Sequence, residues 1–135
     1  MYMLDTNTAT YILGGRSVAA RGTYKQHLDF GHVAISVITQ AEILFGIENK
    51  PEATRLRAAI DSFLGSIEIL VWDSAAAFAY ARLRARMNAA GKNLSAIDML
   101  IAAHAVSVGA VLVTRDQAFR FVVPMLDVVD WATDL

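Results

Sequence analysis

The stretch YMLDTNTATYI, residues Tyr2 to Ile12, decides how the chain begins to fold. A short apolar run ends at Asp5, and the pattern from Thr6 onward is helical, so a strand is expected to give way to a helix without a connecting loop. The carboxylate at this junction has two explanations. It caps the helix by accepting a hydrogen bond from a backbone N–H, or it binds a metal ion. The positions of the other acidic residues distinguish between these explanations.

Outward from this stretch, short apolar runs alternate with longer helical patterns. Strands are expected at residues 2–4, 33–36, 67–71, 111–114 and 126–129, and helices at 6–13, 18–28, 39–49, 52–64, 75–90 and 96–108. A short helical turn is expected after Asp116, and two of the connections between strands are expected to hold two helices each. This alternation predicts an α/β fold: a three-layer α/β/α sandwich with a mainly parallel central sheet, formed by residues 1–135 as a single domain.

The composition restricts the class of protein. Of the 135 residues, 56% are hydrophobic and 19% are charged, which favours a globular chain over a disordered one. The net charge of −1 excludes a global positive field, so any contact with phosphate groups has to be local. The absence of cysteine excludes disulfides, thiolate catalysis and sulfur-bound zinc. No signal peptide or membrane span is recognisable, so a cytoplasmic protein without a membrane partner is expected.

Four acidic residues occupy positions that a parallel sheet brings to one edge. Asp5 ends the first expected strand, and Asp116 follows the fourth. Glu42 and Asp98 lie in the expected first turns of the helix after the second strand and of the helix before the fourth. Carboxylates gathered at this edge beside an apolar core would repel one another, and a divalent cation removes the repulsion. Oxygen ligands without cysteine and with little histidine favour Mg²⁺ or Mn²⁺.

Each acid also has a purely structural explanation. TQAE at residues 39–42 and SAID at residues 95–98 fit the spacing of a capping box, and Asp5 and Asp116 could be simple N-caps. An acid in a first helical turn is stabilised by the helix dipole in any case. Taken singly, each acid is explained as well by capping as by metal binding. Four caps at one edge of a sheet would be a coincidence, so the sequence favours a metal site.

Four segments together resemble a known pattern: MLDTN at 3–7, ISVITQAEILFG at 35–46, SAIDMLIAAHA at 95–105 and VLVTRD at 111–116. In this order they resemble the acidic motifs of the PIN-domain nucleases, and the best match is to the VapC-like ribonuclease toxins of type II toxin–antitoxin systems. The closing VVDW at 128–131 resembles the last strand of that branch. The resemblance implies a PIN-like fold, a Mg²⁺- or Mn²⁺-dependent endoribonuclease that hydrolyses RNA phosphodiester bonds, a homodimer and a cognate antitoxin. Transfer RNA is one substrate that it suggests.

The resemblance also implies roles for individual residues. It assigns the four acids to the catalytic site: Asp5, Glu42, Asp98 and Asp116. The expected metal ligands among them are Asp5, Asp98 and Asp116, while the remaining glutamate contributes a ligand or orients the attacking water. Polar positions that support these acids in the family are matched by Thr6, Asn7 and Thr114. Toxins of this branch often carry a further acid where this chain has Ala118, so one bound ion is expected here and not two.

Three arginines are candidates for contact with the RNA substrate: Arg82, Arg86 and Arg115. Arg82 and Arg86 lie one turn apart on one face of an expected helix, where an ordinary solvated face is the alternative explanation. Arg115 lies beside Asp116 at the proposed site. His104, close to the apolar stripe of its helix, is expected to be a core histidine.

Two other functions fit parts of the sequence. An aspartyl-nucleophile phosphatase or phosphotransfer domain would use Asp5 as its nucleophile, but such phosphatases need a second acid two residues later, where this chain has Asn7. A non-catalytic PIN-like module that binds nucleic acid or protein would keep the fold without the chemistry, and Ala118 leaves this alternative open. Absence of both Mn²⁺ binding and RNA cleavage would favour the module.

Overall fold

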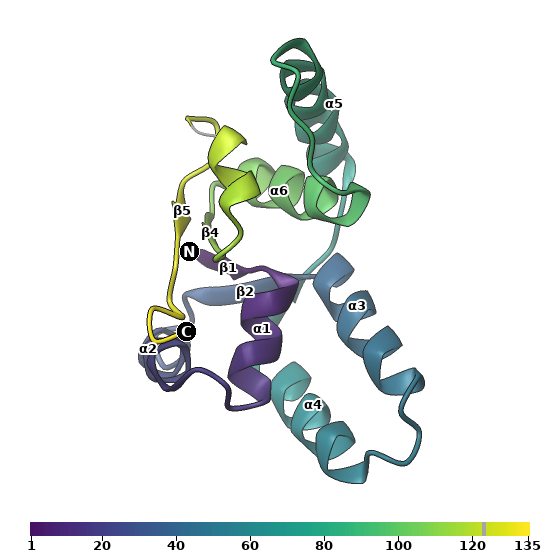
Figure 1. The fold of residues 1–135 in the computed structure, drawn as a ribbon, viewed down its shortest axis with the longest axis vertical. Helices are drawn as coiled ribbons and strands as arrows, with labels where there is room; N and C mark the ends of the chain where they lie inside the picture. Colours follow the sequence, from purple (N-terminus) through teal and green to yellow (C-terminus); the bar gives the residue numbers. More distant parts are fainter. Residues whose placement is uncertain (123) are drawn as a thin grey trace.

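In a computed structural model, which describes residues 1–122 and 124–135, a parallel sheet lies between two layers of helices (Figure 1). The strands of the described residues are β1 (Tyr2–Leu4), β2 (Val33–Ser36), β3 (Glu68–Leu70), β4 (Val111–Val113) and β5 (Val128–Val129). They form one sheet in the order β3-β2-β1-β4-β5, so the first strand lies at its centre. Every described strand pair is parallel. The predicted three-layer α/β/α sandwich is confirmed.

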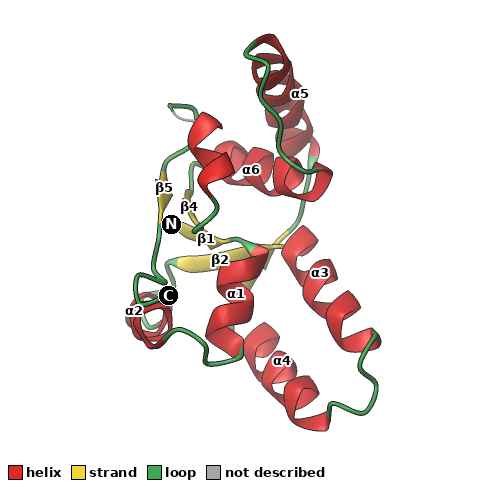
Figure 2. Cartoon of the chain, viewed as in Figure 1, coloured by secondary structure: helices red, strands yellow, loops and turns green. Residues whose placement is uncertain are grey.

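The helices divide between the two faces of the sheet. They are α1 (Thr6–Leu13), α2 (Val18–Leu28), α3 (Val37–Glu48), α4 (Thr54–Ser66), α5 (Ser74–Ala89), α6 (Ala96–Val108) and the 3-10 helix η1 (Gln117–Val122). Figure 2 shows α5, α6 and η1 on one side of the sheet and α1, α3 and α4 on the other. The prediction that two connections hold two helices each was wrong, because the connection from β3 to β4 holds two as well. Within the described residues no helix is long and apolar enough to cross a membrane.

The central strands supply both hydrophobic cores. Met3 and Leu112 are fully buried in the core beneath α5, α6 and η1, whereas Leu4 and Val113 are fully buried in the core formed with α1 to α4. Successive side chains of a strand point to opposite faces, so even three-residue strands contribute to both cores. A strand buried on both faces needs apolar residues throughout, and this explains the uninterrupted apolar sequence of β4.

Three helices begin and end where the sequence predicts: α1, α2 and α6. Each starts after a side chain that accepts a hydrogen bond from a backbone N–H in the first turn, and these caps are Asp5, Ser17 and Ser95. The caps satisfy N–H groups that have no partner within a helix. A local signal therefore fixes each of these three starting points.

The start of α3 differs from the prediction. The helix start expected at residue 39 was wrong, because Ser36 caps α3 by accepting a hydrogen bond from the Ile38 N–H (3.0 Å). The helix consequently begins at Val37, and Glu42 lies in its second turn, not in its first. Other boundaries move by one or two residues, and the strands expected at 67–71, 111–114 and 126–129 are each shorter.

Candidate active site at the carboxyl ends of the strands

The strand order reverses between β1 and β4, and two of the predicted acids lie at this point. From β1 the chain proceeds in one direction to β2 and β3, then returns to place β4 on the other side of β1. Asp5 directly follows β1, and Asp116 lies three residues after Val113 at the end of β4. Parallel α/β sheets bind ligands in the crevice outside the strand carboxyl ends at such a reversal. This edge is therefore the candidate active site.

Asp5 is fixed by hydrogen bonds to two elements. Its backbone N–H donates to the Val113 carbonyl (3.1 Å), and its Oδ1 accepts from the Thr8 N–H (2.8 Å). The Thr8 hydroxyl donates to the same carbonyl of Val113 (3.2 Å), so α1 is fastened to β4. Burial raises the pKa of the Asp5 carboxyl, hydrogen bonds from Thr114 and Thr8 lower it, and the charge of Asp98 raises it, for a net upward shift. Asp5 is thus a helix cap and a buried acid near a second negative charge.

Asp98 connects the two strand-end acids electrostatically. It lies half-buried in the first turn of α6, where its N–H donates to the Ser95 hydroxyl (3.2 Å). Burial raises its pKa, the Ser95 hydrogen bond lowers it, and the charge of Asp116 raises it, again with a net upward shift. Asp98 therefore lies within electrostatic range of both Asp5 and Asp116. The structure brings these three predicted ligands to the same edge.

Thr114 contacts both strand-end acids. The exposed Asp116 donates its N–H to the Thr114 hydroxyl (3.0 Å) and accepts at Oδ1 from the Ala118 N–H (2.9 Å). The same buried threonine lies close enough to the Asp5 carboxyl to lower its pKa. The sequence predicted support from Thr114 for Asp116, but the contact with Asp5 joins residues too far apart in the chain for a local pattern to reveal.

Glu42 lines a separate hollow beside the aspartates. It is half-buried, and with Thr6 and Gly46 it lines a cavity of about 160 Å³ between α1, α3 and α4. The Thr6 hydroxyl donates to the Thr39 hydroxyl (3.4 Å), which connects the first turns of α1 and α3. Asn7 is exposed on α1. Neither Thr6 nor Asn7 donates a hydrogen bond to a carboxylate in the described part of the chain, so Thr6 is placed beside Glu42 and not against the aspartates.

The donors at this edge fit a hard divalent cation. Among residues 1–122 and 124–135, no three histidine or carboxylate side chains lie close enough together to hold a metal ion. Mg²⁺ is commonly held by only one or two carboxylates, and water or substrate oxygens complete its coordination. Burial is the main cause of the raised pKa values of Asp5 and Asp98, and the smaller contribution from a neighbouring carboxylate is a repulsion that a divalent cation would offset. Donor chemistry and charge therefore both suit Mg²⁺ or Mn²⁺.

The arginines predicted to contact RNA lie in two places. Arg82 and Arg86 are exposed on α5, where Arg86 lines a cavity of about 230 Å³ between α5 and η1. The Arg115 guanidinium donates to the Ala132 carbonyl (2.6 Å) and lies 3.9 Å from the Asp130 carboxylate. Arg115 is therefore bound by the C-terminal segment, although it lies two residues after the strand that leads to the acidic edge.

A contact that sequence reasoning missed joins the two helices behind the acids. His104 of α6 is buried, as predicted for a core histidine, and its Nδ1 lies 2.7 Å from the Ser36 hydroxyl. Burial lowers the pKa of His104, while the charge of Asp73 and the backbone of Val71 act in the opposite direction. The serine directly before α3 is a local capping signal that could have identified Ser36. Nothing local indicates its histidine partner.

The sequence matches a known family over nearly its whole length. The PIN domain family matches residues 2–122. The tRNA(fMet)-specific endonuclease VapC of Shigella flexneri is 31% identical over 115 residues, which cover 85% of this chain and 86% of that protein. Ribonuclease VapC2 of Haemophilus influenzae is 33% identical over 115 residues, with coverage of 85% and 86%.

Solved structures give the same result. A chain of VapBC2 from Rickettsia felis, bound to a promoter DNA fragment, matches with a TM-score of 0.88 and 28% identity over 96% of this chain and 98% of that chain. DNA-bound VapBC from Salmonella typhimurium matches with a TM-score of 0.88 and 30% identity, covering 96% and 97%. The chain therefore belongs to the PIN domain family, whose nucleases are typically metal-dependent. Within it, the chain is a member of the VapC ribonuclease toxins of toxin–antitoxin systems, so the class predicted from the four acidic motifs is confirmed.

Proposed function

We propose that residues 1–135 form a single domain that hydrolyses RNA phosphodiester bonds with Mg²⁺ or Mn²⁺ held by Asp5, Asp98 and Asp116. The observation that carries this proposal is the position of Asp98, within electrostatic range of both strand-end acids where the strand order reverses. Such an anionic centre is unfavourable without a cation. It is therefore suited to bind one.

In this proposal the protein groups position the reactants. The bound cation would lower the pKa of a water molecule and neutralise charge that develops on the phosphate. Asp5 Oδ1 accepts a hydrogen bond from the Thr8 N–H and Asp116 Oδ1 accepts one from the Ala118 N–H, so both carboxylates are oriented before substrate arrives. Glu42, on the neighbouring helix α3, would accept a hydrogen bond from the attacking water and orient it. The exposed Asp116 lies where RNA can reach it.

The substrate and partners are proposed by analogy with the relatives. A relative 31% identical to this chain is a tRNA(fMet)-specific endonuclease, so we assign transfer RNA as the substrate class. The matching solved structures are VapBC complexes, which supports a cognate antitoxin that neutralises this chain. We further propose a homodimer, and a cytoplasmic location where the RNA is available.

The test is Mg²⁺-dependent cleavage of initiator tRNA, compared with an elongator tRNA, by the wild type and by Asp98→Asn. Mutating a residue that only hydrogen-bonds a metal ligand typically lowers metal affinity or activity about 10–100-fold. Loss of a ligand itself is therefore expected to lower the cleavage rate by more than about 100-fold. Asp61→Asn is the matched control, since Asp61 is exposed on α4 away from the edge. Full activity of Asp98→Asn would refute the assignment, and absence of both cleavage and Mn²⁺ binding in the wild type would favour the non-catalytic module.

A further inference from the structure

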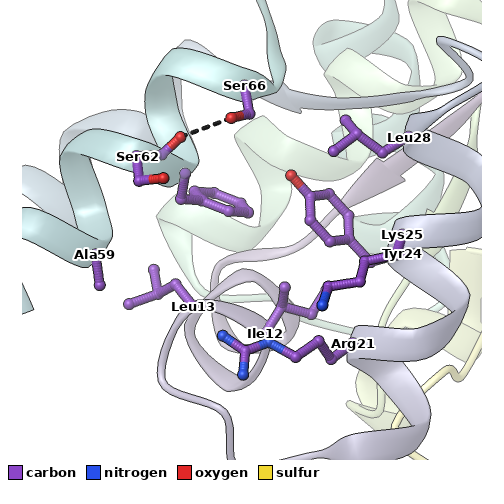
Figure 3. A pocket seen from close by; sticks show the side chains of 10 residues that line it. Ile12, Leu13, Arg21, Tyr24, Lys25, Leu28, Ala59, Ser62 and Ser66 are labelled. Carbon is purple, nitrogen blue, oxygen red and sulfur yellow. Dashed lines mark hydrogen bonds between the residues drawn. The ribbon is translucent and has the colours of Figure 1, made fainter.

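A further hollow lies at the opposite end of α1 from the acidic edge. It has a volume of about 240 Å³ and is formed by α1, α2 and α4 (Figure 3). The residues of α1 that line it, Ile12 and Leu13, are the last two of the helix, whereas Asp5 caps the first turn. The hollow is therefore separate from the candidate active site.

Two cationic side chains line this hollow without an acidic partner. Arg21 and Lys25 lie one turn apart on α2. Within the described residues no carboxylate comes within 4.0 Å of either. The Arg21 Nη1 would lie 3.4 Å from a Cβ on Gly15, whose φ of +69° favours glycine. Because Gly15 has no side chain, the Arg21 guanidinium has room at the rim of the hollow.

Neutral hydroxyl groups line the same space. Tyr24 lies between the two cations in sequence, and Figure 3 shows its hydroxyl pointing into the space between α2 and α4. Burial raises the pKa of Tyr24, so its hydroxyl keeps the proton that it can donate. Ser62 and Ser66 line the hollow from α4, and Ser66 donates its own proton to the Ser62 carbonyl (2.8 Å). Neither the Tyr24 nor the Ser62 hydroxyl donates a hydrogen bond to another described residue, so both can donate to an anion.

The charge around the hollow is positive even after the helix ends are counted. The C-termini of α1 and α4 lie at the hollow, and each carries about −0.5 elementary charge. Arg21 and Lys25 contribute two full positive charges, which leaves a net charge of roughly +1. This matches the single negative charge of a phosphodiester.

We propose that Arg21, Lys25 and Tyr24 form a phosphate-binding site outside the active site, sized for the phosphate and sugar of one nucleotide. Pockets that enclose a whole drug-sized ligand measure roughly 300–1,000 Å³, and the volume of about 240 Å³ falls below that range. One nucleotide of an RNA backbone therefore fits better than a complete dinucleotide cofactor. The assignment of RNA as the molecule that carries the phosphate rests on the proposed function. The inference that the hollow binds a phosphate group does not depend on it.

The experiment measures binding of a fluorescent single-stranded RNA oligonucleotide in EDTA, where cleavage plays no part. Arg21→Gln and Lys25→Gln are compared with Arg57→Gln, which removes the same charge from an exposed α4 position that does not line the hollow. Each phosphate contact contributes about 0.7 to the slope of log K against log salt for single strands. Arg21→Gln and Lys25→Gln are each expected to flatten the slope by about 0.7 and to weaken binding about three- to tenfold at low salt. Tyr24→Phe keeps the aromatic packing against Phe63 and should weaken binding without changing the slope.

A second arm titrates inorganic phosphate and adenosine monophosphate while backbone amide shifts of α2 and α4 are followed. Arg21→Gln could abolish the saturable shifts and leave oligonucleotide binding unchanged. That result would support a phosphate-binding site but would refute RNA as the molecule that supplies the phosphate. Equal effects of Arg57→Gln and Arg21→Gln in both arms would overturn the site.

In the cleavage assay Arg21→Gln should raise KM and leave kcat unchanged. A chain that binds RNA through this site but cuts nothing would contradict the proposed function alone.

Discussion

The Nδ1 atom of His104 lies 2.7 Å from the hydroxyl oxygen of Ser36, and this buried contact joins α6, which carries Asp98, to the start of α3, which carries Glu42. The same serine oxygen accepts the Ile38 N–H at 3.0 Å and so begins α3. One hydroxyl therefore sets both where a helix starts and how it sits against its neighbour. The relative position of Glu42 and Asp98 depends on it.

Ser36→Ala is expected to lower the free energy of unfolding by about 1.5–5 kcal/mol. The change removes a helix cap, worth about 0.5–2 kcal/mol, and leaves a buried imidazole nitrogen without its partner, at a cost of about 1–3 kcal/mol. Urea unfolding measures the loss. Ser95→Ala is the control, because that exposed serine caps α6 and makes no buried side-chain contact among the described residues, so only the capping part should be lost. Equal losses in the two variants would show that the histidine contact contributes nothing.

His104 should make folding stability depend on pH in the neutral range. Burial lowers its pKa from the ordinary value of 6.5, so the unfolded chain binds the proton more readily than the folded one. The stabilisation is complete above about pH 6.5 and is lost as pH falls from there through the folded-state pKa. His104→Gln, which cannot titrate, should flatten this part of the stability profile. An unchanged slope between about pH 7 and pH 5 would contradict the prediction.

Asp5→Asn should stabilise the metal-free protein while it abolishes cleavage. Asparagine caps a helix about as well as aspartate, so the Thr8 N–H keeps its partner. The substitution removes a buried negative charge that lies near Asp98. In EDTA at about pH 8 the melting temperature is expected to rise, and added Mg²⁺ should raise that of the wild type but not that of the variant. A metal-free variant less stable than the wild type would argue against charge repulsion at this edge.

Metal-free wild type should lose stability as pH rises, because of the same acids. The folded-state pKa values of Asp5 and Asp98 lie above the ordinary 3.8, so the folded protein binds more protons than the unfolded chain between these values. Stability from these groups is present below about pH 3.8 and falls as pH rises through the folded-state pKa values. Mg²⁺ should cancel the decline, since its ligands bind as carboxylates. Denaturant titrations with EDTA and with Mg²⁺ test this, and parallel profiles would exclude a metal at these residues.

Asp134, near the C-terminus, should make the folded state more stable as pH rises, which is opposite to the effect of Asp5 and Asp98. Its carboxylate accepts hydrogen bonds from the Ser17 hydroxyl and from the N–H groups of Val18 and Ala19 at the start of α2. The Ser17 hydrogen bond is the largest cause of its lowered pKa, so its stabilisation is present above about pH 3.8 and is lost as pH falls through the folded-state pKa. Asp134→Asn should lower the melting temperature at neutral pH and have less effect in acid. The exposed Asp127→Asn serves as control.

Capping residues and hydrophobic periodicity predicted those helix limits and strands that neighbouring residues in the sequence determine. The limits of α1, α2 and α6 follow from caps that stand directly before them, as at Asp5 and Ser95. The start of α3 was missed because Ser36 is both the last residue of a buried strand and a cap, and the pattern at residues 39–42 competed with it. Periodicity also placed the strands, since both faces of the sheet need apolar residues.

In the candidate site, too, some features could be predicted from the sequence and others could not. Strand ends and helix starts brought Asp5, Asp98 and Asp116 to one edge, which topology alone predicts. The partners of these acids come from residues distant in sequence and leave no local trace. Arg115 illustrates this, because its guanidinium donates a hydrogen bond to the carbonyl of Ala132, seventeen residues later in the sequence.

The central place of β1 also determines when the acidic edge can exist during synthesis. The Thr8 hydroxyl reaches the Val113 carbonyl across 105 positions of sequence, and β1 cannot pair with β4 before that segment is made. Pairing over such a separation is slow because the chain must first close a long loop. A nascent chain with β1 to β3 already outside the ribosome would still lack Thr114 and Asp116. The acidic edge therefore cannot form on a nascent chain until β4 and Asp116 have been made.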